Sequence, residues 1–414
     1  MNEPIAQHDA DRLTLGAERR PAMRIALVVG AACLAVSAVI ALWTEGGPQR
    51  FLLAYLVSYC FFLSVSLGAL FFVMLQHVTR AGWSVGIRRL AENLSATMPM
   101  LAILAIPIVV SVAMQNGSLY PWARGVADLR DDHAILAKRP YLNPAFFIVR
   151  LVVYLGVWSY LARWFLRLSK EQDQSGAISL TRRMEIASAP ALVVFGITVT
   201  LAAFDLIMSL DPHWYSTIFG VYFFASCAIA GYASLILAVY LLQRRGYLRE
   251  GITPEHYHDL GKFLFGFTFF WGYIAFSQYM LLWYANIPEE TAWLYRRGLT
   301  TATGQMTGWT AIAAVLLLGQ LLIPFAGLMS RSVKRHKALL AFWAAWALVF
   351  HWVDLYWLIM PELDGRLHFG VPELGTALGL GGIFVAYAIL VASRQSLRPM
   401  ADPRLEESLA FENV

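Results

Sequence analysis

Ten apolar runs, each long enough to cross a bilayer as a helix, divide the 414-residue chain. A helix needs about 20 predominantly apolar residues to span the hydrocarbon core, where its backbone hydrogen bonds must be made internally. Charged residues make up only 14% of the chain, whereas a soluble domain has about 25%. We therefore predict an all-α, polytopic membrane protein with about ten transmembrane helices and no soluble domain. The predicted spans are 24–44, 51–76, 94–114, 143–168, 186–208, 216–242, 259–285, 305–329, 336–360 and 371–393.

Most of the 32 Lys and Arg residues fall in the loops on one side of these spans, the side that also carries both termini. Cytoplasmic loops hold the excess of positive charge in membrane proteins. We expect a multi-pass protein of the bacterial inner membrane with both termini cytoplasmic: a tail at 1–23, a membrane domain at 24–393 and a tail at 394–414. Because the basic residues lie between apolar runs, the net charge does not indicate nucleic-acid binding.

A short polar hinge joins the fifth and sixth runs, in the stretch FDLIMSLDPHWYSTIFGVYFF at 204–224. It places Asp205, Asp211 and His213 near the outer surface. The ninth run ends in a similar way, with VDLYWLIMPELD at 353–364. The two runs are four spans apart and share a direction. Internal repeats are common in membrane proteins, so we predict two four-helix bundles, spans 2–5 and 6–9, flanked by helices 1 and 10.

Several ionisable side chains lie inside or at the ends of the spans. A charge at the bilayer centre costs about 2.5–3.5 kcal/mol on insertion scales, and such residues usually face the protein interior. His351 and Asp354 are three positions apart, hence on one helix face, and Asp205 lies at similar depth. At the inner end, Asp259 and Lys262 are one turn apart. A proton path could use these groups and a hydroxyl between them: Asp205, Asp211, His213, Asp259, Lys262, Tyr273, His351 and Asp354.

Other interpretations of the same residues remain open. The acids could simply pair with neighbouring helices. Aromatic residues such as Trp271, Trp283 and Trp352 could wall a quinone site, but an aromatic belt at the interface gives the same composition, so no quinone ligand is assigned. The sequence HYHD at 256–259 could hold a divalent ion or begin a helix. We favour the helix start, and assign no metal ligand, haem ligand or catalytic residue to this chain.

Two long blocks resemble a known family. The hinge block 204–226 and the block HDLGKFLFGFTFFWGYIAFSQYMLLWYANIPEET at 258–291 are similar to the ActF family. These are NrfD/polysulfide-reductase-like membrane subunits of alternative complex III, a respiratory quinol:cytochrome c oxidoreductase. The resemblance covers most of the chain from about residue 25. It implies two four-helix bundles with flanking helices, and a subunit that binds no cofactor and has no catalytic activity alone.

The resemblance also implies partners. A homologous ActC-type membrane subunit would carry the quinol site, and periplasmic subunits would carry iron–sulfur clusters and haem c, with lipid around them. The leading hypothesis is a subunit that provides a proton path and a scaffold for quinol oxidation. A quinone-binding membrane anchor, a purely structural anchor and a secondary transporter are the alternatives. Against the transporter, no Gly- or Pro-broken helices stand at matching mid-membrane positions.

Overall fold

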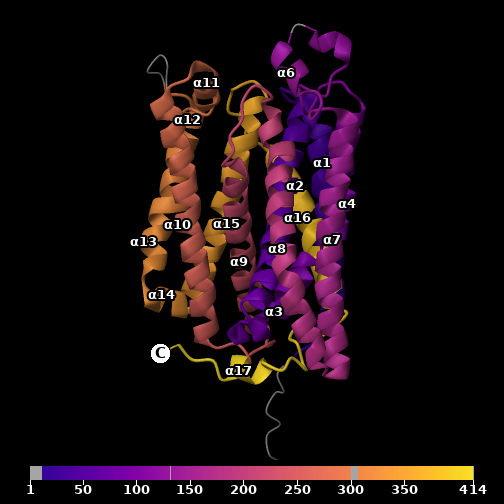
Figure 1. Cartoon of the computed structure of the whole chain (residues 1–414), viewed down its shortest axis with the longest axis vertical. Coiled ribbons are helices and arrows are strands. Elements are labelled where there is room, and N and C mark those ends of the chain that lie inside the picture. Colours follow the sequence, from indigo (N-terminus) through magenta and orange to yellow (C-terminus); the bar gives the residue numbers. More distant parts are fainter. Residues whose placement is uncertain (1–11, 131, 300–305, 414) are drawn as a thin grey trace, which may run out of the picture.

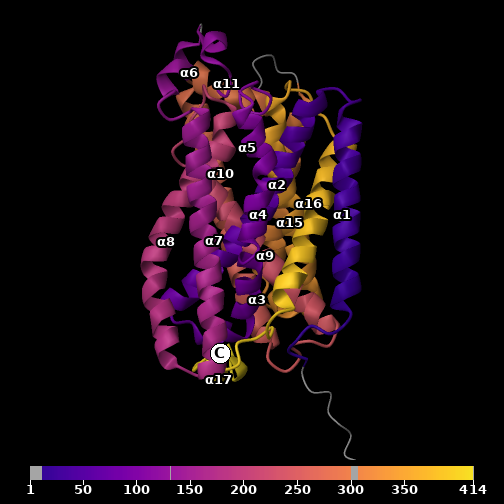
Figure 2. The same cartoon turned by 90° about the vertical axis from the view of Figure 1, so that its right-hand side faces the viewer.

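Long helices running side by side make up the fold (Figures 1 and 2). The computed structural model describes residues 12–130, 132–299 and 306–413, and this part of the chain contains no β-strand. The long helices are α1 (Arg19–Ala41), α2 (Gly47–Val78), α7 (Pro144–Ser175), α8 (Ile178–Leu206), α9 (Phe219–Arg244), α10 (Pro254–Ala285), α15 (Lys337–Ile359) and α16 (Val371–Ala392). The shorter ones are α3 (Val85–Ser95), α4 (Met98–Leu104), α5 (Ile106–Ala113), α6 (His133–Lys138), α11 (Pro288–Arg296), α12 (Gly308–Leu316), α13 (Ile323–Met329), α14 (Arg331–Arg335) and α17 (Leu405–Leu409).

Ten helical runs in the described residues are long and apolar enough to cross a membrane, which confirms the predicted number of spans. Two of them are interrupted. The third consists of α3, α4 and α5, with Pro99 and Pro107 in the first turns of α4 and α5. The eighth passes from α12 to α13 through a π-helical segment, Leu317–Leu322, just before Pro324. Proline has no backbone N–H to continue the helical ladder, so each interruption lies where the sequence removes a donor.

The helices group as the repeated Asp-Leu pattern predicts. α2, α3–α5, α7 and α8 contact one another and form the first bundle, and α9, α10, α12–α13 and α15 form the second. α1 and α16 pack along each other and against α2. Among the ten spans, α2 is the most buried and α1 the least. The nearly uniform apolar sequence of α2 agrees with its central place, since it has protein on all sides.

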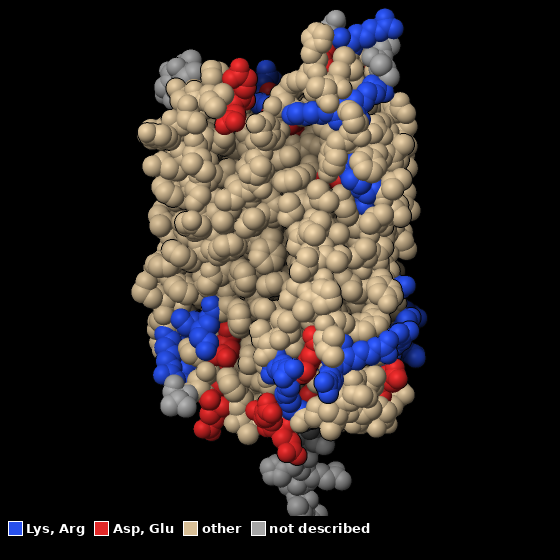
Figure 3. All heavy atoms as spheres, viewed as in Figure 1, with Lys and Arg blue, Asp and Glu red and all other residues tan. Residues whose placement is uncertain are grey.

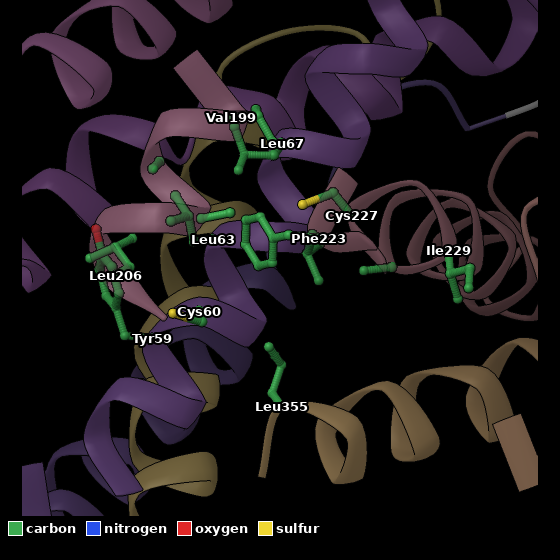
Figure 4. Packing of buried hydrophobic residues seen from close by; sticks show 14 of the residues in the cluster. Tyr59, Cys60, Leu63, Leu67, Val199, Leu206, Phe223, Cys227, Ile229 and Leu355 are labelled. Carbon is green, nitrogen blue, oxygen red and sulfur yellow. The ribbon is translucent and has the colours of Figure 1, made fainter. Parts of the chain in front are cut away.

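The two bundles meet where α2 crosses α9, and two glycines allow that close approach. A Cβ atom at Gly68 would lie 1.9 Å from the carbonyl oxygen of Cys227, and one at Gly231 would lie 2.4 Å from the carbonyl carbon of Gly68. Around this crossing, Leu63, Leu67, Phe223 and their neighbours form a buried apolar layer (Figure 4).

Both described ends of the chain lie at the same end of the molecule, which we call the termini end; the hinge, residues 207–218, lies at the opposite, hinge end (Figures 1 and 2). The described part of the N-terminal tail, from residue 12, packs against the loop after α9. α1 already begins at Arg19, not at residue 24, and Tyr247 accepts a hydrogen bond from the backbone N–H of Gly16 at 3.1 Å.

The C-terminal strap, residues 394–413, crosses the termini end (Figure 1). Its Ser408 hydroxyl donates to the Trp83 carbonyl at 2.8 Å and accepts from the Gly86 N–H at 3.0 Å. Its Asn413 amide donates to the Asp259 carboxylate on α10 at 3.1 Å. The strap therefore links the first bundle to the second.

Candidate functional site

Asp354 on α15 is buried inside the second bundle, against α9. Its Oδ1 accepts a short hydrogen bond from the Tyr222 hydroxyl on α9, and the Ser226 hydroxyl, one turn further along α9, lies 3.5 Å from Oδ2. The side chain is 0% exposed. Every other buried acid that the structure describes within the spans has a basic side chain within ion-pair distance, whereas Asp354 has none. Among the described residues, its side-chain hydrogen bonds come from these two hydroxyl groups.

His351 lies one turn before Asp354 and is also fully buried. Its Nε2 is 2.7 Å from the Ser64 hydroxyl of α2. That hydroxyl donates its own proton to the carbonyl of Phe61 at 2.7 Å. The imidazole therefore donates from Nε2–H, and its Nδ1 is a proton acceptor with no protein partner in the described residues. The face that the spacing of His351 and Asp354 predicts does point inward.

Asp205 on α8 has a different environment. Arg150 on α7 donates to it twice, from Nε and from Nη2, each at 2.8 Å, and the Tyr154 hydroxyl donates at 2.9 Å. The third guanidinium nitrogen of Arg150 donates to the Tyr141 carbonyl at 2.8 Å. This bidentate ion pair neutralises the carboxylate and fixes its orientation. The two Asp-Leu sequences therefore place acids at similar depth but give them partners of different kinds.

An outer ion network, which consists of Asp211, Arg296, Arg297 and Glu362, joins the hinge to the loop after α11. Arg296 pairs with Asp211 and donates to Glu362 at 2.7 Å. Arg297 donates to the same Glu362 at 2.8 Å and to the carbonyl of Leu358 at 2.6 Å. Arg297 is 2% exposed, and burial lowers the pKa of its guanidinium from the ordinary value. Leu358 is one helical turn beyond Asp354, so the network runs from the surface to the edge of the Asp354 site.

His213 faces the loop before α6 instead of the Asp354 site. Its Nε2 lies 2.8 Å from the carboxylate of Asp132, which also accepts from the backbone N–H of Ile135 at 3.0 Å as the N-cap of α6. The Ile135 N–H, and then His213, lower the pKa of Asp132. Asp211 is 3.8 Å from His213. This arrangement orders the hinge-end surface.

The remaining predicted residues are not brought together with these. Lys262 and Asp259 form an ion pair at 2.5 Å at the termini end, where the Lys262 side chain is 48% exposed. Tyr273 is 60% exposed on the outer side of α10, so it does not contribute a hydroxyl between the two groups. His256 and Thr253 form a capping box at the start of α10, which begins at Pro254, five residues before the predicted start. The described residues contain no group of three His, Cys, Asp or Glu that could hold a metal ion.

The structure also shows a termini-end charged cluster that the sequence interpretation missed, formed by Arg88, Arg89 and Glu92 of α3, Asp173 of α7 and His77 of α2. Arg89 donates to Glu92 at 3.0 Å and to Asp173 at 2.8 Å. His77 Nε2, Glu92 Oε1 and Arg89 Nη1 are buried without a hydrogen-bond partner. The predicted third span begins at residue 94, so the sequence places residues 88–92 in the inner loop before it. The amphipathic spacing of residues 85–95 was the sequence feature that could have indicated a helix there.

A second missed pair lies beside α16. Arg50 on α2 donates to Glu373 from Nε at 2.7 Å and from Nη2 at 2.9 Å, and both side chains are buried. The aromatic residues that could line a quinone site do not lie together. Trp283 and Tyr284 are 51% and 81% exposed, whereas Trp271 is buried beside Tyr222.

Comparison of the chain with protein-family models and with curated proteins finds no match, so the family resemblance of the two sequence blocks remains a prediction.

Proposed function

We propose that this chain is an integral subunit of a membrane-bound quinol:cytochrome c oxidoreductase, in which it exchanges protons through Asp354 and supports the quinol-oxidising subunit. The single observation that carries the proposal is the buried carboxyl group of Asp354, whose partners are the hydroxyls of Tyr222 and Ser226 and not a cation. The rest of the proposal follows the resemblance of residues 204–226 and 258–291 to the ActF family.

The contrast among the buried acids supports a proton-exchanging role. A buried charge is expensive unless it is paired, and Asp205 and Glu373 each have a bidentate arginine. These two ion pairs hold neighbouring helices together. The Tyr222 and Ser226 hydroxyls can donate hydrogen bonds to the ionised carboxylate of Asp354. No basic side chain in the described residues pairs with this carboxylate, so none opposes its protonation. It is therefore suited to take up and release a proton, with the free Nδ1 of His351 one turn away as a second acceptor.

Access from the hinge end would follow the outer ion network. Arg296 is partly exposed, while Arg297 and Glu362 are buried, so the network leads inward from the surface. Its last contact, from Arg297 to the Leu358 carbonyl, ends one turn from Asp354. Water among these groups could connect the site to the outer compartment.

The termini-end charged cluster would serve the opposite side. It holds unpartnered buried polar atoms, which are the groups that ordered water usually satisfies. On α2, Leu67 of the buried apolar layer (Figure 4) lies between Ser64, which contacts His351, and His77 of the cluster. A proton path in this chain would therefore have two polar halves with an apolar layer between them. Asp259 and Lys262, the inner group that the sequence suggested, would lie beside this path.

The assembly implied by the proposal has an ActC-type membrane subunit beside this chain and periplasmic subunits that carry iron–sulfur clusters and haem c. Electron transfer would occur in those partners, and the chain would contribute protonation and scaffolding. The excess of Lys and Arg supports a cytoplasmic location for the termini end, and the proposed complex would lie in a bacterial inner membrane.

The test uses the complex purified from its native membrane with an affinity tag on this chain. Asp354→Asn keeps the size of the side chain but removes the exchangeable proton, and the matched control is Glu289→Gln, an exposed acid at the hinge end. We expect both complexes to retain haem c and iron–sulfur subunits, with proton release per quinol lowered in Asp354→Asn alone. An unchanged proton yield would refute the role of Asp354. Purification of a lone oligomer without redox subunits would refute the assembly and favour the transporter.

A further inference from the structure

A groove on the membrane-facing side of α7 and α8 is independent of the Asp354 site. Its apolar part, about 510 Å³, is lined by Gly156, Tyr160 and Leu161 of α7 and by Pro190 and Val194 of α8, among others. A second hollow of about 530 Å³ shares Gly156 and Tyr160 with it and continues along α7 to Arg163, Trp164 and Arg167. Both volumes are in the range of small-molecule sites, about 300–1,000 Å³.

Sequence accounts for the shape of the groove. Gly156 has no side chain, and a Cβ added there would meet no atom within 4 Å, so the surface of α7 is hollowed at this point. The hydroxyl of Ser159, which lines the second hollow, is buried without a hydrogen-bond partner. The groove therefore offers an apolar channel and an unused polar group beside it.

The charge along the groove changes towards the termini end. Arg163 and Arg167 on α7 are exposed and have no hydrogen bond or ion pair to any residue that the structure describes. Arg183 on α8 lies with its guanidinium 5.8 Å from the ring of Trp164. Figure 3 shows the wider setting: a tan belt with few charged residues occupies the middle of the molecule, and Lys and Arg gather below it, including the side where α7 and α8 run.

We propose that this groove binds an anionic phospholipid of the leaflet at the termini end. One acyl chain would occupy the apolar hollow beside Gly156, and the phosphate would contact Arg163 and Arg167. Basic pockets between transmembrane helices bind anionic headgroups, and arginine matches the geometry of phosphate. An apolar helix of a partner subunit would fill the same hollow but would leave both arginines without an anion. Charge complementarity therefore favours the lipid.

The first test measures lipid retention by native mass spectrometry of the full-length chain, purified in detergent and titrated with dioleoyl phosphatidylglycerol or dioleoyl phosphatidylcholine. The variant Arg163→Gln/Arg167→Gln is compared with Arg20→Gln/Arg24→Gln, which removes two exposed arginines with the same spacing from α1. We expect the preference for phosphatidylglycerol to fall about tenfold or more in the α7 variant and to persist in the α1 variant. Equal preference in the two variants would overturn the proposal.

The second test leaves the charges in place and blocks the channel. Gly156→Leu puts a side chain into the hollow. The matched control is Gly196→Leu, which adds the same side chain to α8. A Cβ at Gly196 also meets no atom within 4 Å, and Gly196 does not line the groove. We expect phosphatidylglycerol retention to fall in Gly156→Leu only. Retention that survives Gly156→Leu, or a partner helix seated in the groove of the assembled complex, would overturn the proposal. Neither result bears on Asp354.

Discussion

Arg150 on α7 holds the Asp205 carboxylate on α8 through two hydrogen bonds of 2.8 Å, one to each carboxylate oxygen. Both side chains are nearly inaccessible, and Tyr154 adds a third donor. The pair ties the two helices together near the hinge end. Asp354, at the corresponding place in the second bundle, has hydroxyl partners only. Substitutions at these two acids should therefore have different consequences.

Asp205→Asn should destabilise the fold. The substitution leaves the Arg150 charge buried without its counter-charge, and breaking a buried pair in this way costs about 3–5 kcal/mol. We expect this loss in the free energy of unfolding, measured by titration with sodium dodecyl sulfate in mixed micelles. Tyr154→Phe, which removes one hydroxyl and keeps the ion pair, should lose less. Equal stability of Asp205→Asn and the unmodified chain would contradict the pair's structural role.

Tyr222→Phe should change the vibration of the Asp354 carboxyl group. The substitution removes its closest donor and leaves the Ser226 hydroxyl at 3.5 Å. Infrared difference spectra recorded across a pH titration should show a protonated carboxyl band that is absent from Asp354→Asn and moves to higher frequency in Tyr222→Phe. Tyr232→Phe is the control, because that hydroxyl is buried on the same helix and forms no hydrogen bond to Asp354. A band at the same frequency in the unmodified chain, Tyr222→Phe and Tyr232→Phe would argue against the Tyr222 contact.

Gly68→Ala should weaken the contact between the bundles. Its Cβ would lie 1.9 Å from the Cys227 carbonyl oxygen, so the helix backbones must move apart. Overpacking of a close contact costs about 1–3 kcal/mol, and we expect a loss of that order in the same unfolding titration. Gly266→Ala on α10 places its Cβ in open space and should not destabilise the protein.

The N-cap of α6 should open in acid. The Ile135 N–H and His213 hold the pKa of Asp132 below its ordinary value of 3.8. A carboxyl group with a lowered folded pKa stabilises the fold above its unfolded pKa, and that contribution disappears as the pH falls through the folded pKa. Hydrogen exchange in residues 132–142 should therefore rise, after correction for the intrinsic rate, as the pH falls below about 4.

Asp132→Asn provides the control for the acid response, because asparagine caps helices well but does not titrate. In this variant, protection of residues 132–142 should lose most of its dependence on pH. The same acid response in both chains would show that another group controls the loop.

The number of spans and their grouping could be predicted because they depend on local composition and on a short repeated pattern. The inward face of α15 could also be predicted, since His351 and Asp354 are polar residues in an apolar helix. α10 was harder. Trp271 is 5% exposed and Tyr273 is 60% exposed, yet nothing in the local sequence separates their two faces. Lipid and protein interior are both apolar, so hydrophobicity does not distinguish them.

The partners of the ionisable groups could not be predicted. Arg150 falls near the start of the predicted fourth span, 143–168, but its contact with Asp205 depends on how α7 and α8 are rotated against each other. Arg296 lies far along the chain from Asp211, and no spacing rule connects them. The termini-end charged cluster was missed because α3 carries Arg88, Arg89 and Glu92 into the protein, where paired charges replace the apolar residues that a span is expected to show.

The pairing of α1 with α16 has a consequence for how the chain is made. About 330 residues separate the end of α1 at Ala41 from the start of α16 at Val371, and translation at about 5–20 residues per second takes roughly 20–60 s to cover them. During that time α1 lies in the membrane without α16, the helix that it mainly packs against. The Ser37 hydroxyl donates to the Pro372 carbonyl at 2.9 Å in the finished fold, and this acceptor does not yet exist. The first span of the nascent protein therefore gains its main packing partner only after the tenth span, α16, has been made.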